Sequence, residues 1–212
     1  MKNYTIYNHQ TADVLYEGKY RSFKECLEDS VRKNINMMHA DLSGQNLSNV
    51  NIDNAQLSNA LFRGSNLCQA NLSEGDYRSA DFTGANLIGA CMAESDFSSC
   101  NFKAAHFGAN ILNNTILDRA EFNTLSAYLL PFCDVKSMHE CSFFHHENQL
   151  FTISKPPVVL LGAHNTPMVL AANTVFYGHQ KAVRHIKEFT TPAQNHNLDV
   201  HKEVDKVAQK AI

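Results

Sequence analysis

The sequence of 212 residues lacks a long apolar run. Its longest, PPVVLLGA at 156–163, is far too short to cross a bilayer, and the opening MKNYTIYNHQ holds no apolar run of signal-peptide length. These absences predict no contact with a membrane. We therefore expect a cytoplasmic protein.

Tryptophan, paired cysteines and an excess of positive charge are missing as well. The six cysteines are scattered without a CxxC pair, which argues against a disulfide framework and a zinc ribbon. Lys and Arg total 18 against 21 Asp and Glu, so the net charge of −3 offers no basic surface for nucleic acid. We expect no direct nucleic acid binding.

What the sequence does contain is a period of five residues from Ala40 to Thr124. An apolar residue recurs at every fifth position, as in A-D-L-S-G, Q-N-L-S-N and A-D-F-T-G, and the residue two places before each apolar centre is usually small. A period of five fits neither a helix nor a strand, so it indicates one small unit stacked on itself. Two inward and three outward positions per unit explain the period.

The motif A-(D/N)-L-x-x resembles the pentapeptide-repeat family over residues 40–124. The resemblance implies a mainly β fold, a right-handed four-sided β-helix (a solenoid) in which four pentapeptides make one turn and residues twenty apart stack. Sorting the centres by twenty places Phe62, Phe82, Phe102 and Phe122 in one column with Leu42, a clustering that such a turn accounts for. Stacked rings gain burial and offset ring contacts.

Three segments are expected along the chain: an N-terminal hairpin and helix at 1–34, the repeat β-helix at 35–145, and a strand-rich module with helices at 146–212. At the front, YTIYN and DVLYEGKY predict two strands, and Ser22 is the expected N-cap of a helix with Phe23, Leu27 and Val31 on one side. Open coil ends aggregate unless covered, which is the role expected of the hairpin and helix.

Beyond Phe122 the period breaks and recovers by skipping one residue. This predicts a final coil with a bulge, whose inward centres are Tyr128, Cys133, Met138 and Phe143. From about Leu150, PPVVLLG, PMVLAA and TVFYG predict a small antiparallel meander, and HQKAVRHIKEF and LDVHKEVDKVAQKAI predict two helices. This order of elements resembles members of the family carried by bacteriophages and prophages.

Catalytic motifs are absent, since the sequence has no phosphate loop, GxGxxG or GxSxG. Serines and aspartates follow the period of five and not a nucleophile–base geometry, so we predict no enzyme and no cofactor. The strongest local candidate is HECSFFHH, with possible metal ligands at His139, Cys141, His145 and His146. Cys141 falls at a small inward position and no second pair has metal-finger spacing, so no metal site is predicted.

Function is therefore expected on the outer faces. The family includes proteins that resemble duplex DNA and bind DNA gyrase, which requires a strongly acidic surface. Between residues 40 and 124 nine acids outnumber four bases, a modest net charge of −5. We favour a phage-type adaptor or inhibitor that binds a host or viral protein. The alternatives are a DNA-mimicking modulator of gyrase and a self-associating structural protein.

One edge of the expected coil is acidic. Glu74 and Glu94 lie twenty residues apart, as do Asp76 and Asp96, so all four carboxylates should line one edge. Like charges facing each other across strands cost roughly 0.2–1 kcal/mol, which favours a functional edge that presents negative charge to a basic groove. The alternative is a silent edge, screened by solvent and offset by Arg78.

Two adjacent faces are nearly uncharged and carry Ile88 and Ile111 at outward positions. We hypothesise that these faces pack against the C-terminal module or a second copy of the chain. The alternative is that isolated surface isoleucines have no function.

Overall fold

The structure, a computed structural model, describes residues 1–122, 130–144, 150–153, 158–161, 167–171, 174–177 and 180–185. The chain forms two compact units, Met1–Ser154 and Lys155–Ile212. The division into three segments expected from the sequence stays a prediction.

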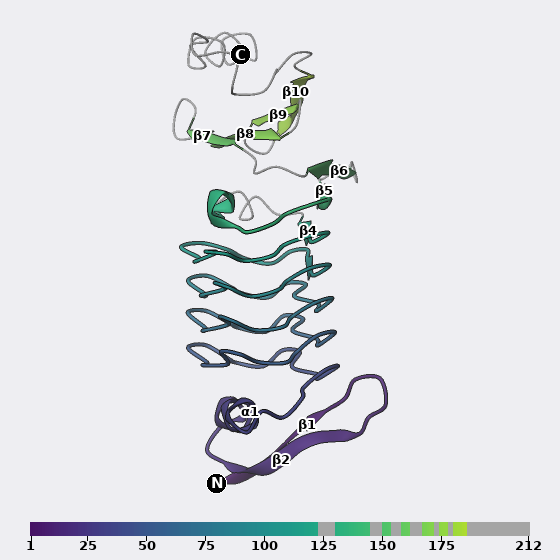
Figure 1. Ribbon diagram of the computed structural model, residues 1–212, viewed down its shortest axis with the longest axis vertical. Helices are drawn as coiled ribbons and strands as arrows, with labels where there is room; N and C mark the ends of the chain where they lie inside the picture. Colours follow the sequence, from purple (N-terminus) through teal and green to yellow (C-terminus); the bar gives the residue numbers. More distant parts are fainter. Residues whose placement is uncertain are drawn as a thin grey trace. The chain divides into compact units, whose positions relative to one another are not determined.

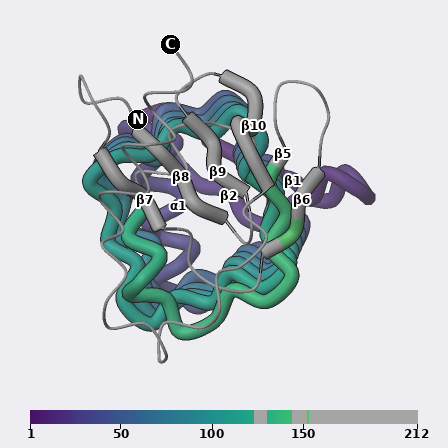
Figure 2. The backbone as a smooth tube through the Cα atoms, turned by 90° about the horizontal axis from the view of Figure 1, so that it is seen from above, coloured from purple at the N-terminus to yellow at the C-terminus, as the bar shows by residue number. Residues whose placement is uncertain are grey.

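The first unit is built on coils of twenty residues. Parallel β-bridges join residues twenty apart, from Asp41–Leu61 to Asp96–Ile116, and confirm the predicted stacking. Seen from above, the coils superpose as a four-sided outline (Figure 2), and from the side they form parallel layers (Figure 1). Two stretches of this ladder are strands, β3 (Asn101–Phe102) and β4 (Glu121–Phe122), which pair in parallel.

The apolar centres fill the inside of the coils. Every centre from Leu42 to Phe122 is buried, as predicted. The rings of Phe62, Phe82, Phe102 and Phe122 stack in one column with successive centroids 4.6, 5.2 and 5.2 Å apart. Burial and ring contacts therefore recur along the column, coil after coil.

In the pentapeptide from Asp81 to Ala85, all five backbone N–H groups are hydrogen-bonded. The N–H groups of Phe82 and Gly84 donate to the next coil, and that of Asp81 donates to the previous one. The Ala85 N–H closes a turn onto the Phe82 carbonyl, at 2.9 Å. The remaining N–H, that of Thr83, donates to Asp81 Oδ1 at 2.9 Å. An Asp or Asn immediately before the apolar centre thus accepts the one N–H of the unit for which the backbone offers no acceptor.

The corners of the coil need left-handed backbone. The residue two places after each centre has positive φ throughout, from Gly44 (66°) to Arg119 (58°). Positive φ at this position, together with the turn hydrogen bond, is typical of a type II turn. Glycine and asparagine suit such a corner best, and the early repeats have them at Gly44, Asn49, Asn54, Asn59 and Gly64.

A hairpin and a helix precede the coils, where the sequence predicts them. Strands β1 (Lys2–Tyr7) and β2 (Val14–Tyr20) pair antiparallel and are followed by α1 (Phe23–Arg32). Ser22 Oγ accepts the Glu25 N–H at 3.1 Å, which makes it the N-cap. The buried side of α1 is formed by Cys26, Leu27 and Ser30, whereas Phe23 and Val31 of the predicted stripe are half-buried.

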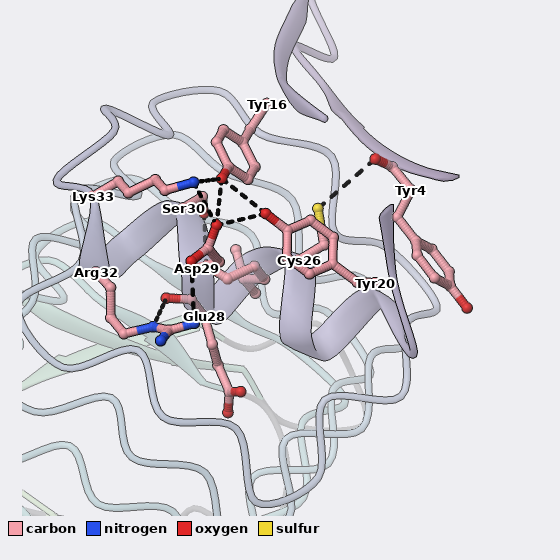
Figure 3. Close-up of polar contacts among 10 residues, drawn as sticks. Tyr4, Tyr16, Tyr20, Cys26, Glu28, Asp29, Ser30, Arg32 and Lys33 are labelled. Atoms are coloured by element: carbon pink, nitrogen blue, oxygen red, sulfur yellow. Dashed lines mark hydrogen bonds and ion pairs between the residues drawn. The ribbon is translucent and has the colours of Figure 1, made fainter. Parts of the chain in front are cut away.

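A cluster of polar side chains ties α1 to the hairpin (Figure 3). Asp29 accepts hydrogen bonds from the hydroxyls of Tyr16 and Tyr20, at 2.5 Å each, and from Lys33 Nζ at 2.8 Å. The hydrogen bond from Lys33 is the largest cause that holds the pKa of Asp29 well below its ordinary value. The hydrogen bond to Asp29 in turn raises the pKa of Tyr20.

The last described turn of the β-helix is one residue longer than the others. Ile116 pairs with Ser137 and Phe122 with Phe143, both twenty-one residues apart, which confirms the predicted skip. Met138 and Phe143 are buried, as predicted. The strands of this end are β5 (Cys141–Phe144), parallel to β4, and β6 (Leu150–Ile153), antiparallel to β5.

The prediction of Cys133 as an inward centre is wrong. Cys133 is exposed, and Phe132 is buried in its place within a short 3-10 helix, Phe132–Asp134. The Phe132 ring packs edge-on against Phe122 and Phe143, with centroids 5.8 and 6.0 Å away. The larger apolar ring takes the inward position because the extra residue of this turn frees it from the period of five. Tyr128 lies outside the described residues.

The second unit contains an antiparallel sheet of order β10-β9-β8-β7, which matches the expected meander. Its strands are β7 (Val158–Leu161), β8 (Pro167–Ala171), β9 (Thr174–Tyr177) and β10 (Gln180–His185). The helix predicted for HQKAVRHIKEF is wrong over 180–185, which form β10. Pairing with β9 at Gln180, Arg184 and His185 outweighs a weak local helix preference. The helix predicted for LDVHKEVDKVAQKAI lies outside the described residues.

Candidate interaction surface

The structure brings the four predicted carboxylates together at one corner of the coils. Asp76 and Asp96 form a parallel bridge. Glu74 and Glu94 precede them by two residues in successive coils and occupy the left-handed corner. We name these four residues the acidic corner. They line one open depression together with Gly75, Ser95, Asn114, Ile116 and Lys136.

The two aspartates have a structural reason to be there. Asp76 Oδ1 accepts the Arg78 N–H at 3.2 Å, and Asp96 Oδ1 accepts the Ser98 N–H at 2.9 Å, the same bond that Asp81 makes to Thr83. Arg78 also binds Asp76 through Nε at 2.8 Å and Nη2 at 2.7 Å, and the hydrogen bond from its side chain is the largest cause that lowers the pKa of Asp76. An aspartate here is therefore weak evidence of function.

The two glutamates have no such reason. Glu74 and Glu94 have φ of 57° and 60°, a backbone region that glutamate seldom adopts. Both are exposed, and neither has a hydrogen-bond or ion-pair partner for its side chain among the described residues. Positive φ occurs at every corner of the coils, so what distinguishes these two corners is the charged, unpartnered side chain. Glu74 and Glu94 are thus the more informative half of the acidic corner.

The corner is rigid because a buried ring lies against it. A Cβ on Gly75 would lie 2.4 Å from Cε2 of Tyr77, so only glycine fits between Glu74 and Asp76. The hydroxyl of Tyr77 donates to the Ile52 carbonyl at 3.1 Å, and burial raises the pKa of this tyrosine. The carboxylates are consequently held on a fixed backbone.

One cation in the depression was not predicted. Lys136 lines it from the last turn, where its N–H donates to the Thr115 carbonyl at 2.9 Å. Lys136 could not be placed from the sequence because the period of five is broken in this turn. With Lys136 and Arg78 counted, two positive charges face the four carboxylates, and the corner keeps net negative charge.

Comparison with known proteins identifies the repeat. A family model described as pentapeptide repeats matches residues 34–64 and 60–98, in eight copies. Residues 34–98 of the chain thus consist of pentapeptide repeats. The match supports the right-handed, four-sided β-helix, in agreement with the twenty-residue coils. No curated protein matches the chain.

Several solved structures resemble this pentapeptide-repeat protein. One, from the thylakoid lumen of Arabidopsis thaliana, is 26% identical with a TM-score of 0.38, and the match covers 42% of this chain and 65% of that protein. A second, from Nostoc Pcc 7120, is 21% identical with a TM-score of 0.33, covering 50% and 83%. A third, QnrB1, a plasmid-mediated fluoroquinolone resistance protein, is 16% identical with a TM-score of 0.24, covering 48% and 66%. The chain thus spans just under two thirds of the Arabidopsis protein.

The two isoleucines lie on other faces of the pentapeptide-repeat coils. Ile88 is 44% exposed and Ile111 is 48% exposed, on adjacent faces that meet at a neighbouring corner. One of these faces carries a ladder of amides, in which Asn66 donates to Asn46 at 3.2 Å and Asn86 donates to Asn66 at 3.3 Å. That these faces bind another surface stays a prediction.

The histidine-rich segment falls partly outside the described residues, which exclude His145 and His146. Cys141 is buried at its predicted inward position and donates through Sγ to the Leu117 carbonyl at 2.9 Å. Burial raises the pKa of its thiol to about 12. His139 is exposed. In the part of the chain that the structure describes, no group of His, Cys, Asp and Glu has the arrangement of a metal site, and no bilayer-spanning helix is found.

Proposed function

We propose that this pentapeptide-repeat protein is a non-enzymatic binding protein that docks its acidic corner on a basic surface of a partner protein. The observation that carries the proposal is the pair Glu74 and Glu94. They are exposed, lack partners among the described residues and occupy left-handed corners that glutamate disfavours. The coil hydrogen bonds fix the backbone that carries these carboxylates, so little backbone freedom is lost on binding.

The partner class that fits best is a host or viral protein with a local Lys- or Arg-rich patch, bound by a phage-type adaptor or inhibitor. A DNA-mimicking modulator of DNA gyrase, the alternative, would present negative charge along the length of a duplex. Residues 40–124 carry a net charge of only −5, and four of their nine acids lie at one corner. A concentrated charge favours local docking over duplex mimicry.

The N-terminal hairpin and α1 have the role of a cap on the first coil. Two contacts support this role: Tyr7 accepts the Asp41 N–H through its carbonyl, and Glu28 Oε1 accepts the Asn51 N–H, both at 2.9 Å. These bonds supply acceptors to a coil that has no preceding coil below it.

The test compares Glu74→Gln/Glu94→Gln with a control, Asp41→Asn/Asp53→Asn, which removes the same charge from other faces. Partners of the full-length protein are captured from host lysate, identified by mass spectrometry and purified, and their affinities are measured beside that of purified gyrase. We expect the glutamate variant to bind the partner about tenfold more weakly and to lose the dependence of affinity on salt.

The control should bind like the wild type. Equal weakening in both variants would mean that net charge, and not the acidic corner, attracts the partner. Unchanged binding by the glutamate variant refutes the proposal. Tight, salt-sensitive binding to gyrase that both variants weaken would support the DNA-mimicking alternative.

A second candidate, self-association through the neutral faces, is favoured by the exposure of Ile88 and Ile111. Ile88→Glu would then convert a multimer to a monomer or increase protease cleavage of the C-terminal residues. If it changes neither, this candidate fails.

A further inference from the structure

Strand β2 is a free edge. On the other side of the hairpin, β1 continues into the coil through an antiparallel bridge between Asn8 and Ala40 and a bond from the Asp41 N–H to the Tyr7 carbonyl. The backbone of β2 (Val14–Tyr20) is hydrogen-bonded only to β1 among the described residues. Figure 1 shows β2 on the side of the hairpin away from the coils. A seven-residue open edge is a template for pairing with another strand.

The side chains of β2 are divided between two faces. Tyr16 and Tyr20 point toward α1, where both donate to Asp29 (Figure 3). Because side chains alternate along a strand, Glu17 and Lys19 share the opposite face, and both are exposed. Neither has an ion-pair partner among the described residues. An acid and a base two residues apart on an open edge are thus available to a partner strand.

We propose that a second copy of the chain pairs with this edge. The two β2 strands run antiparallel about a two-fold axis at Gly18, so that Glu17 of each copy lies opposite Lys19 of the other. The two hairpins then form one four-stranded sheet with β2 at its centre. Opposite charges that face each other across strands stabilise the pairing, and the symmetry makes two such pairs.

The charges select this register over its neighbours. An axis at Glu17 would place the two glutamates opposite each other, and an axis at Lys19 would do the same for the two lysines; both arrangements are destabilising. An axis between Glu17 and Gly18, or between Gly18 and Lys19, leaves the charges without an opposite partner. Only the axis at Gly18 pairs every charge on this face of β2 with its opposite.

The test is a charge swap in the full-length protein, with the dimer dissociation constant measured by sedimentation equilibrium. Glu17→Lys and Lys19→Glu, taken singly, each turn two attractive pairs into repulsive ones, and we expect either to weaken the dimer about tenfold or more. The double variant Glu17→Lys/Lys19→Glu restores both pairs in reverse and should return to within about threefold of the wild type. Lys2→Glu, in β1, is the control with the same charge change as Lys19→Glu, and it should leave the dimer unchanged. Circular dichroism checks that every variant is folded.

Hydrogen exchange of the amides of residues 14–20 gives a second readout that does not depend on a variant. Exchange should slow as the protein concentration rises through the dissociation constant. A wild type that stays monomeric overturns the proposal, and so does a dimer in which the double variant fails to recover. Slow exchange of these amides in a monomer would show that another part of the same chain covers the edge. A dimer with unchanged exchange at β2 would place the contact elsewhere. None of these residues belongs to the acidic corner, so this result is independent of the proposed function.

Discussion

The coils and the N-terminal hairpin with its helix are held together in different ways. In the coils, every unit repeats the same buried centre and the same set of backbone hydrogen bonds, so stability is spread over many equivalent contacts. In the hairpin and helix, the buried apolar residues are few, chiefly Ile6, Cys26 and Leu27. One carboxylate, that of Asp29, joins the two elements. Repetition makes the coils tolerant of polar changes, whereas the polar contacts between hairpin and helix centre on Asp29.

The largest expected effect is in the coils. Phe82→Ala removes the ring that stacks between Phe62 and Phe102, at 4.6 and 5.2 Å, and leaves a cavity. We expect a loss of about 3–5 kcal/mol of unfolding free energy, measured by denaturant melts. Ser73→Ala, at an outward position of the coils, is the control and should cost far less. Similar losses for the two would mean that the inward and outward positions are wrongly assigned.

The second-largest expected effect comes from removing the charge of Asp29, which joins the hairpin to the helix. Asp29→Asn removes the charge that binds Tyr16, Tyr20 and Lys33, at a cost of about 1.5–3 kcal/mol to the local structure. Hydrogen exchange should become faster in β1, β2 and α1 and stay slow in the coils. Asp13→Asn, in the exposed hairpin turn, is the matched control and should change neither region. Faster exchange throughout the coils would show that the two regions do not differ as described.

The pH dependence of the same contact follows from the lowered pKa of Asp29. A carboxyl whose folded-state pKa is lowered contributes its full stability above the unfolded-state value, about 3.9, and loses it as the pH falls toward the folded-state value. The difference in stability between the wild type and Asp29→Asn should therefore be constant near neutral pH and shrink below about pH 4. Melting curves over a pH series measure it. A difference that persists unchanged in acid would show that Asp29 acts by packing and not by charge.

The smallest effect is at the acidic corner. Glu94→Asn replaces a residue that disfavours positive φ by one that accepts it, so we expect a gain of roughly 0.5–1 kcal/mol in unfolding free energy. Glu94→Gln, which removes the same charge but is no better suited to positive φ, is the comparison and should bring no comparable gain. Stability that rises while partner binding falls would indicate that the corner gives up stability for function. A loss of stability would refute the strain at Glu94.

The repeat was predictable because one constraint, inward or outward, acts at every fifth residue and leaves its record in the sequence. The columns of Phe82 and its neighbours follow from that record alone. The left-handed corners were not predicted. Glycine and asparagine at Gly44 and Asn49 indicated them, but a polar residue fits an ordinary outward position as well as a corner with positive φ.

Where the period breaks, prediction failed for a related reason. One extra residue allows Phe132 and not Cys133 to point inward, and which of them does so depends on packing against Phe122 and Phe143 in the neighbouring strands. The same break in the period prevented the prediction of Lys136 beside the acidic corner. In the acidic corner the sequence weighted four carboxylates equally, and only the hydrogen bonds separate the structural Asp76 from the unpartnered Glu74.

Because one four-sided turn takes twenty residues, the number of a residue decides on which face of the β-helix it lies. Inserting twenty residues would add one coil and keep every later side chain on its own face, whereas inserting five would rotate everything downstream by a quarter of a turn. Five residues placed between Asp76 and Glu94 would therefore carry Glu94 and Asp96 to a different side from Glu74, with the carboxylates all retained. The last turn, in which Ser137 lies twenty-one residues after Ile116, shows that a single extra residue is absorbed without such a rotation. Surfaces on this protein can thus be created or dispersed by changes in length alone.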